Sequence, residues 1–161
     1  MATAGVLAED LLAGLLSERR GLQASLAAIA EREGLVELLD SEPLIVRRAG
    51  GGISDLQRYP VVWIYCKRMK NTARAKFARF SGSVTLVAEV AAAHAKAELA
   101  ERLLHFYIEA LTDVLERSRG DWGSGITYAG GYEVEFSGTK LVGKHYVRSA
   151  RVEIEVMAHL E

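Results

Sequence analysis

Histidine is the residue type most often used for metal binding and acid–base chemistry, and the chain contains four of them. Paired metal ligands on a helix lie about four residues apart, as in zinc proteases. No histidine here has another histidine or a cysteine at such a spacing; they are His94, His105, His145 and His159. We therefore expect surface or partly packed histidines, with no metal site and no cofactor site.

The single cysteine, Cys66, is the one candidate for a thiol nucleophile, and it can form no intramolecular disulfide. A catalytic cysteine needs an exposed, electropositive position, often at a helix N-terminus. Cys66 instead follows the apolar run Val61–Tyr65, where a thiol usually packs as a small hydrophobic group. We expect a structural thiol, even with Lys67 and Arg68 beside it.

Four carboxylates near the C-terminus are candidates for a general acid and base. They alternate strictly with apolar residues, which is typical of the solvated face of a sheet; they are Glu133, Glu135, Glu153 and Glu155. Their expected partners across the strands are Arg148 and Arg151. We assign no catalytic residue and do not expect an enzyme.

The glycine-rich run Ala49–Gly52 invites comparison with phosphate-binding loops. Such a loop needs a following Lys-Ser or Lys-Thr, or a glycine fingerprint between a strand and a helix. Here Ile53, Ser54 and Asp55 follow. The run is therefore predicted to be a flexible loop without a phosphate site.

The most unusual local composition lies between residues 67 and 79, which contain six basic residues and no acidic one. We expect this basic arm to contact nucleic acid or another subunit through Lys67, Arg68, Lys70, Arg74, Lys76 and Arg79. With Phe77 and Phe80 interleaved, it suits a nucleic-acid backbone. Two alternatives have equal weight: the charges keep a hairpin tip soluble and block edge pairing, or they bind an acidic surface of another copy. Only nucleic-acid binding predicts a steep salt dependence.

The basic arm separates two predicted strands. Val61–Tyr65 is β-branched or aromatic, and Val84, Leu86, Ala88 and Val90 fall on one face of a period-two pattern. Together they predict a long hairpin. A short strand, 44–48, precedes it.

Helical patterns lie on both sides of this hairpin. Residues 6–33 form an amphipathic pattern with a break expected near Gly21 and a stop at Gly34. This stripe must be covered by the chain's own sheet, which we favour, or by a neighbouring subunit. A second helix is predicted from about Ala91 to Arg117, with a broad apolar face.

A second hairpin is predicted near the C-terminus, pairing Tyr132–Phe136 with Arg151–Val156. The whole pattern predicts an α+β fold with a largely antiparallel sheet and a long central hairpin, covered by an amphipathic helix. The N-terminal helix is additional. At 161 residues we expect one domain overall, with a helical segment at 1–40 and a core at 41–161.

The net charge of −1 gives no global attraction to nucleic acid or membrane, so any such contact must be local. The N-terminus lacks a cationic leader and is interrupted by Glu9 and Asp10. No apolar run approaches the roughly 20 residues needed to cross a bilayer. We expect a cytosolic protein without a membrane partner.

The order of these elements resembles the tail-terminator and tail-completion proteins of long-tailed bacteriophages, small neck proteins at the head-proximal end of the tail tube. The resemblance spans most of residues 6–157. It rests on an N-terminal helix, a strand begun by a proline, a long hairpin, an amphipathic helix and a closing strand pair. The matching segments are Tyr59–Val62, Gly82–Val90, Tyr132–Phe136 and Ser149–Val156.

The resemblance implies a structural virion protein without catalysis or cofactor. It implies a chain that is monomeric or weakly associated when free and that forms a homo-oligomeric ring, a hexamer, in the virion, where the ring ends the tail tube and joins it to the head. The implied partners are other copies of the chain, the tail tube protein, a head connector or stopper protein, and DNA passing through the lumen. The implied location is the virion neck, with the host cytoplasm during assembly.

Overall fold

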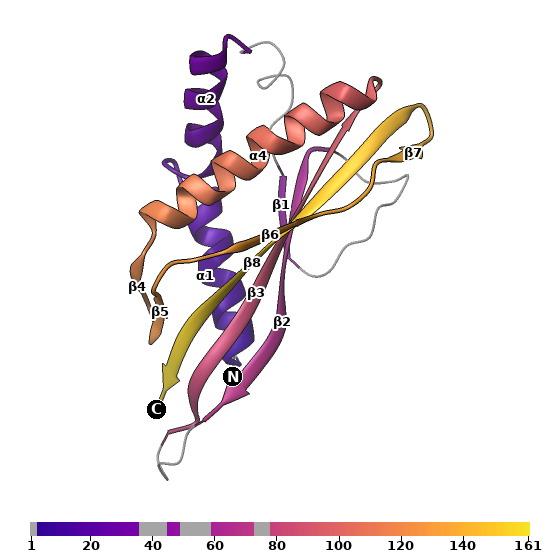
Figure 1. The fold of residues 1–161 in the computed structure, drawn as a ribbon. Coiled ribbons are helices and arrows are strands. Elements are labelled where there is room, and N and C mark those ends of the chain that lie inside the picture. The colour runs from indigo at the N-terminus through magenta and orange to yellow at the C-terminus, as the bar shows by residue number, and fades with distance from the viewer. Residues whose placement is uncertain (1–2, 36–44, 49–58, 73–77) are drawn as a thin grey trace.

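The protein, as a computed structural model, is described for residues 3–35, 45–48, 59–72 and 78–161 (Figure 1). Among the described residues, helices α1 and α4 lie against one twisted, curled sheet and α2 lies on α4, which confirms the predicted α+β class. The helices are α1 (Ala4–Ser17), α2 (Leu22–Glu33) and α4 (Ala97–Arg117). The strands are β1 (Ile45–Arg48), β2 (Val61–Asn71), β3 (Phe80–His94), β4 (Gly120–Gly123), β5 (Ile126–Tyr128), β6 (Glu133–Phe136), β7 (Lys140–Val142) and β8 (His145–Leu160).

The two longest strands, β3 and β8, form the centre of the sheet. They are antiparallel and stay in register from Phe80 opposite Leu160 to His94 opposite Tyr146. Beyond β3 lies antiparallel β2, followed by the short parallel strand β1. The other edge of β8 pairs with three short strands in turn, β7, β6 and β5. The predicted pairing of β6 with β8 is confirmed.

Alternation along β3 and β8 divides the sheet into two faces. The predicted stripe of Val84, Leu86, Ala88 and Val90 is buried in the main core, opposite the alternate residues of β8. Helix α4 covers this face with a stripe of buried residues that includes Leu104 and is otherwise rich in Leu, Val and Ala. No helix in the described ranges is long and apolar enough to span a membrane.

The N-terminal helices pack on their own chain. Helix α1 lies against β2 and β3, and α2 lies against α4. Their buried residues belong to the same core as the sheet. The helices are separated at residues 18–21, and Gly34 ends α2 with a left-handed φ of 69°, so both the predicted break and the predicted stop are confirmed.

Two sequence predictions about element boundaries are wrong. The basic arm does not begin at Lys67 as a loop, because β2 continues to Asn71 opposite Gly82. The alanine-rich segment 91–94 is not the start of a helix but the end of β3, and α4 starts only at Ala97. In both places, pairing with a long neighbouring strand outweighs local preference.

Some predictions fall outside the described residues. These are the loop at Ala49–Gly52 and the middle of the basic arm, which includes Arg74 and Lys76.

Gly14 gives a stability prediction for α1. A Cβ added there would meet no heavy atom within 4 Å. Since alanine favours a helix interior over glycine, we expect Gly14→Ala to raise the free energy of unfolding by about 1 kcal/mol, measured by urea denaturation. The control is Gly5→Ala in the same helix, whose Cβ would lie 3.1 Å from Met69 Sδ. An equal gain in both variants would contradict the prediction.

Candidate interaction surface

The face of the sheet opposite α4 carries the largest group of charged side chains in the sheet. We use the name charged face for the part of this side that is formed by β2, β3, β6 and β8 around one cavity. The strand register and the cavity walls assign to it Tyr65, Lys67, Arg68, Thr85, Val87, Glu89, Glu133, Glu135, Arg151, Glu153 and Glu155. Next to it, a small apolar cluster of Val61, Trp63, Ala91 and Val147 is buried. The predicted solvated acidic face of β6 and β8 is therefore confirmed.

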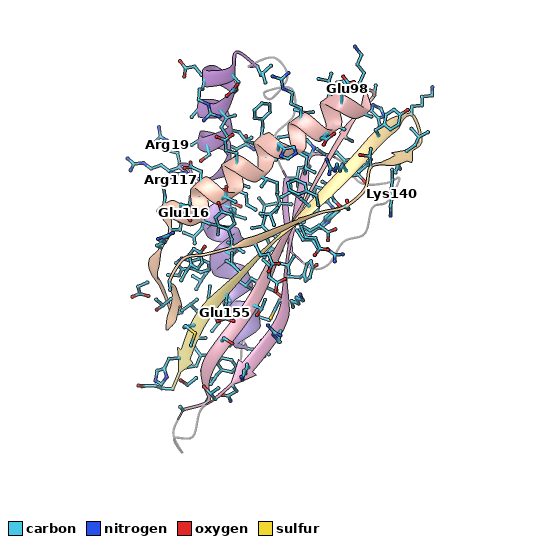
Figure 2. All side chains as sticks on the ribbon, viewed as in Figure 1. Arg19, Glu98, Glu116, Arg117, Lys140 and Glu155 are labelled. Atoms are coloured by element: carbon cyan, nitrogen blue, oxygen red, sulfur yellow. The ribbon has the colours of Figure 1, made fainter. Side chains whose placement is uncertain are left out.

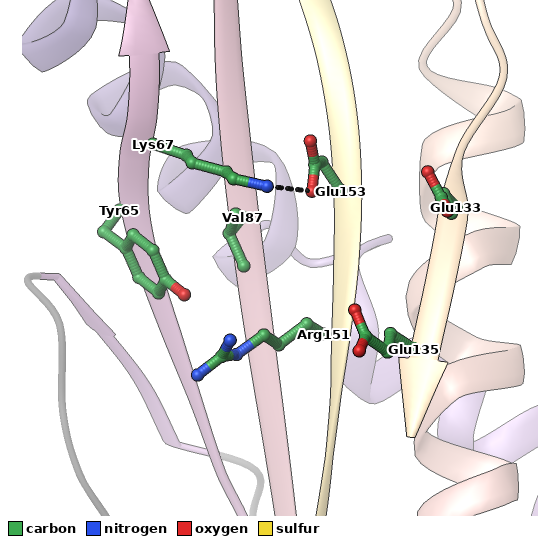
Figure 3. A pocket seen from close by; sticks show the side chains of 7 residues that line it. All are labelled: Tyr65, Lys67, Val87, Glu133, Glu135, Arg151 and Glu153. Atoms are coloured by element: carbon green, nitrogen blue, oxygen red, sulfur yellow. Dashed lines mark hydrogen bonds and ion pairs between the residues drawn. The ribbon is translucent and has the colours of Figure 1, made fainter. Parts of the chain in front are cut away.

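A shallow cavity of about 270 Å³ lies on the charged face (Figure 3). Its walls come from four strands, with Tyr65 and Lys67 from β2, Val87 from β3, Arg151 and Glu153 from β8, and the two glutamates of β6. Lys67 Nζ reaches across β3 to Glu153 Oε2 at 3.0 Å. Lys67 is 54% exposed, so this ion pair fixes the orientation of the side chain but adds little stability.

An irregularity in β2 places two cations on this face in succession. The register passes from Cys66 opposite Leu86 to Arg68 opposite Thr85, so Lys67 is an extra residue in the strand. Such a bulge bends the strand and changes which side chains share a face. Consequently Lys67 and Arg68 both belong to the charged face, while Met69 returns to the side of α1 opposite Val84.

Negative charge exceeds positive charge on this surface. Glu153 pairs with Lys67, and the largely buried Glu89 pairs with Arg151 at 3.7 Å. Glu133 and Glu135 make no ion pair within the described residues. Glu133 also lies directly opposite Glu153, an arrangement that like charges disfavour.

Of the two arginines predicted to face these glutamates across the strands, Arg151 lies directly opposite Glu135, whereas the prediction for Arg148 is wrong. Arg148 projects to the α4 side, where Nη1 contacts Glu101 Oε1 at 2.6 Å and the guanidinium lies over Phe136. Arg151 lies opposite Glu135 of β6 in the register, but its ion pair is with Glu89 of β3. The error was in assigning Arg148 to the wrong face.

Four of the six predicted contact residues in the basic arm are described. Arg68 and Lys70 are exposed on β2 and form no ion pair with any described residue. Arg79, in contrast, donates from Nε to the carbonyl oxygen of Glu161 at 2.9 Å. The structure thus gathers Lys67, Arg68 and Lys70 on one strand and directs Arg79 to the C-terminus.

Beyond Ile64, the strand carrying these cations has no strand on its outer side in the described part of the chain. Strand β1 pairs with β2 only as far as Ile64, and Cys66 N–H then donates to Glu9 Oε1 of α1 at 2.8 Å. From Lys67 to Lys70 no described strand lies on this side of β2. On the opposite side of the sheet, β6 pairs with β8 alone, so its outer edge likewise has no neighbouring strand among the described residues.

Cys66 is half-buried beside α1, opposite Leu86. Burial raises the pKa of its thiol, and the charge of Glu9 acts in the same direction. Because the thiolate is the reactive form, we expect alkylation by iodoacetamide at pH 8 to be several-fold slower in the native protein than in denaturant, followed by intact-mass spectrometry. Equal rates in the two conditions would contradict this prediction.

The histidines take part in local contacts. His94 Nδ1 accepts a hydrogen bond from Lys96 N–H at 3.0 Å, and the His105 ring stacks on Phe136 with centroids 4.9 Å apart. Across the described ranges, no group of three or more His, Cys, Asp or Glu side chains is placed to hold a metal ion.

A polar contact between α2 and α4 was not anticipated from the sequence. Ser25 Oγ donates to Asp113 Oδ2 at 2.8 Å, and Arg117 Nη2 donates to Ser25 Oγ at 2.6 Å. Arg32 also contacts Glu109 at 2.8 Å. These contacts surround an open groove of about 400 Å³ and position α2 on α4. A serine within the apolar stripe of α2 was the available sequence signal.

Comparison with known proteins adds no family to this description. No protein-family model matches the chain, and a search of curated proteins found no match.

Proposed function

We propose that this protein is a structural assembly protein of a long-tailed phage neck. In this proposal it forms a homo-oligomeric ring that terminates the tail tube and joins it to the head connector. Its partners are then other copies of the chain, the tail tube protein and a connector or stopper protein. It acts by binding, without catalysis or a cofactor.

The observation that carries this proposal is a sheet with a stretch of strand edge on each side, in β2 and in β6, that no described strand covers. Helices cover one face of the sheet. Within the described residues, β6 has no strand on its outer side, and neither has β2 from Lys67 to Lys70, beyond its pairing with β1. A subunit of a ring offers one surface to a neighbour's different surface, and open strand edges are suited to this. The order of helix, long hairpin, covering helix and closing strand pair also matches the order on which the resemblance rests.

The alternative, a small nucleic-acid-binding module using the basic hairpin 67–79, stays a prediction. The geometry favours it less. Lys67 is already paired with Glu153, and the surface beyond it carries five glutamates, which repel phosphates. A steep fall of DNA affinity with rising salt would support this alternative.

The proposed function is tested by deleting the gene from the phage or prophage that encodes it and examining the particles by negative-stain electron microscopy. We expect separate heads and unjoined tails, and normal particles when the wild-type gene is supplied in trans. Purified protein added to isolated tails should bind at one end. Normal infectious particles without the gene would overturn the proposal.

A further inference from the structure

The two open edges of the sheet carry opposite charge. The edge of β2 from Lys67 to Lys70 carries three cations in four residues, of which Arg68 and Lys70 have no ionic partner in the described parts of the chain. The edge strand β6 carries Glu133 and Glu135, which also lack one. Each edge therefore lacks the counter-charge that the other edge supplies.

The direction of the strands also matches. Strand β2 is antiparallel to β3, β3 to β8, and β8 to β6, so β2 and β6 run in opposite directions. If β2 of one copy lay beside β6 of another, the pair would be antiparallel. The charged faces of the two copies would then form one continuous surface, on which Arg68 and Lys70 approach Glu133 and Glu135.

We propose that this chain associates with a second copy of itself by pairing the basic β2 edge of one copy with the acidic β6 edge of the next. The inference deepens the proposed function, on which it rests, by naming the contact between copies. It is a docking of two different edges. Repeated contacts of this kind build a ring or a filament and do not stop at a two-fold dimer.

The charges also select which edges meet. Pairing two β2 edges would bring cations together, and pairing two β6 edges would bring glutamates together. Like charges across paired strands are unfavourable, whereas opposite charges are favourable. The same residues that discourage random edge association thus permit the pairing of β2 with β6.

The register sets a stagger between the copies. Phe136 lies level with Val62 through Ala150 and Val90, and Glu133 lies level with Tyr65 through Glu153 and Val87. The open part of β2 starts beyond this level, at Lys67. Since Lys67 is an extra residue in the strand, placing Glu133 opposite Lys70 displaces the neighbouring copy by four residues of the ladder, or roughly 13 Å along the strands. In a closed ring, such a stagger requires strands tilted against the ring axis, as in a barrel.

The test uses two charge-reversal variants of the full chain. The basic-edge variant carries Arg68→Glu and Lys70→Glu, and the acidic-edge variant carries Glu133→Lys and Glu135→Lys. Association is measured by sedimentation velocity and native mass spectrometry in low salt, from micromolar to millimolar protein. We expect wild-type oligomers and an affinity reduced by at least about tenfold in each variant, since close opposite charges across an interface couple strongly.

Mixing provides the decisive measurement. The basic-edge variant keeps a wild-type β6, and the acidic-edge variant keeps a wild-type β2, so each pair of unlike chains can form one native contact. We expect an equimolar mixture to regain association with equal amounts of the two chains. A variant combining all four substitutions should also regain it.

Matched controls reverse charges elsewhere, with Lys140→Glu and Lys144→Glu for the basic edge, and Glu18→Lys and Glu31→Lys for the acidic edge. Figure 2 shows Lys140 at the opposite end of the sheet from Glu155 of the charged face. Circular dichroism and thermal unfolding establish that every variant is folded. The controls should associate as the wild type does.

Three outcomes would overturn the inference. These are a wild-type chain that is monomeric at millimolar concentration, folded edge variants that associate like the controls, and a mixture that fails to recover. None of these outcomes decides the proposed function, which is tested separately by binding of the protein to isolated tails and by the particles that form when the gene is deleted. Rings that persist in both edge variants, for example, would leave the neck role intact and reject this contact.

Discussion

Replacing Gly82 by alanine is expected to lower the free energy of unfolding by about 3 kcal/mol, because the new methyl group has no space. Gly82 is buried in β3 opposite Asn71, and a Cβ there would overlap the carbonyl oxygen of Lys70. The obstacle is backbone of the neighbouring strand, which cannot rotate away as a flexible side chain can. The strands β2 and β3 must separate locally, and urea denaturation of the purified variant measures the loss.

The matched control is Gly138→Ala. A Cβ at Gly138 would meet no heavy atom within 4 Å, and the residue is exposed. We expect a change within about 0.5 kcal/mol for this variant. Equal stability of Gly82→Ala and Gly138→Ala would contradict the prediction, because it would mean that the backbones of β2 and β3 leave space for a methyl group at Gly82.

Truncating Leu104 to alanine is the second change with a large expected effect, a loss of about 3 kcal/mol. Leu104 is fully buried, in the middle of α4, where the helix covers the sheet. Removing its side chain loses buried apolar surface and leaves a cavity that neighbouring groups fill only in part. The measurement is the midpoint and slope of denaturant unfolding.

Leu141 provides the comparison for Leu104, because its side chain is 63% exposed in β7. Leu141→Ala should change the free energy of unfolding by no more than about 0.5 kcal/mol. Equal losses in the two leucine variants would mean that α4 does not cover the core as described.

The sequence predicted the fold class and most elements because apolar periodicity is strong in this chain. The alternation in 84–90 and 152–156 and the helical stripes before Gly34 and before Arg117 each have one dominant period. Element ends were less predictable. The segment 91–94 is rich in alanine, a good helix former, yet it lies in β3 because β8 offers backbone partners as far as Tyr146.

The candidate surface was predictable only in part. The acidic alternation of β6 and β8 and the basic composition after Cys66 were evident, but the bulge at Lys67 was not. One extra residue changes the face of every side chain that follows it in a strand. For that reason periodicity alone does not join Lys67 to Glu153, 86 residues away. The face of Arg148, in contrast, follows from the alternation of β8, in which Arg148 shares the side of Ala150 and Val152.

The long strand β8 has a consequence for local unfolding. On one side it is paired with β3 along nearly its whole length, while on the other β5, β6 and β7 each pair with only a few of its residues. Short strands open at lower free energy than the centre of a sheet. Hydrogen exchange should therefore be slowest for the amides shared by β3 and β8 and faster in β5, β6 and β7. Each of those three strands can then separate from β8 and pair with it again while β3 and β8 stay paired.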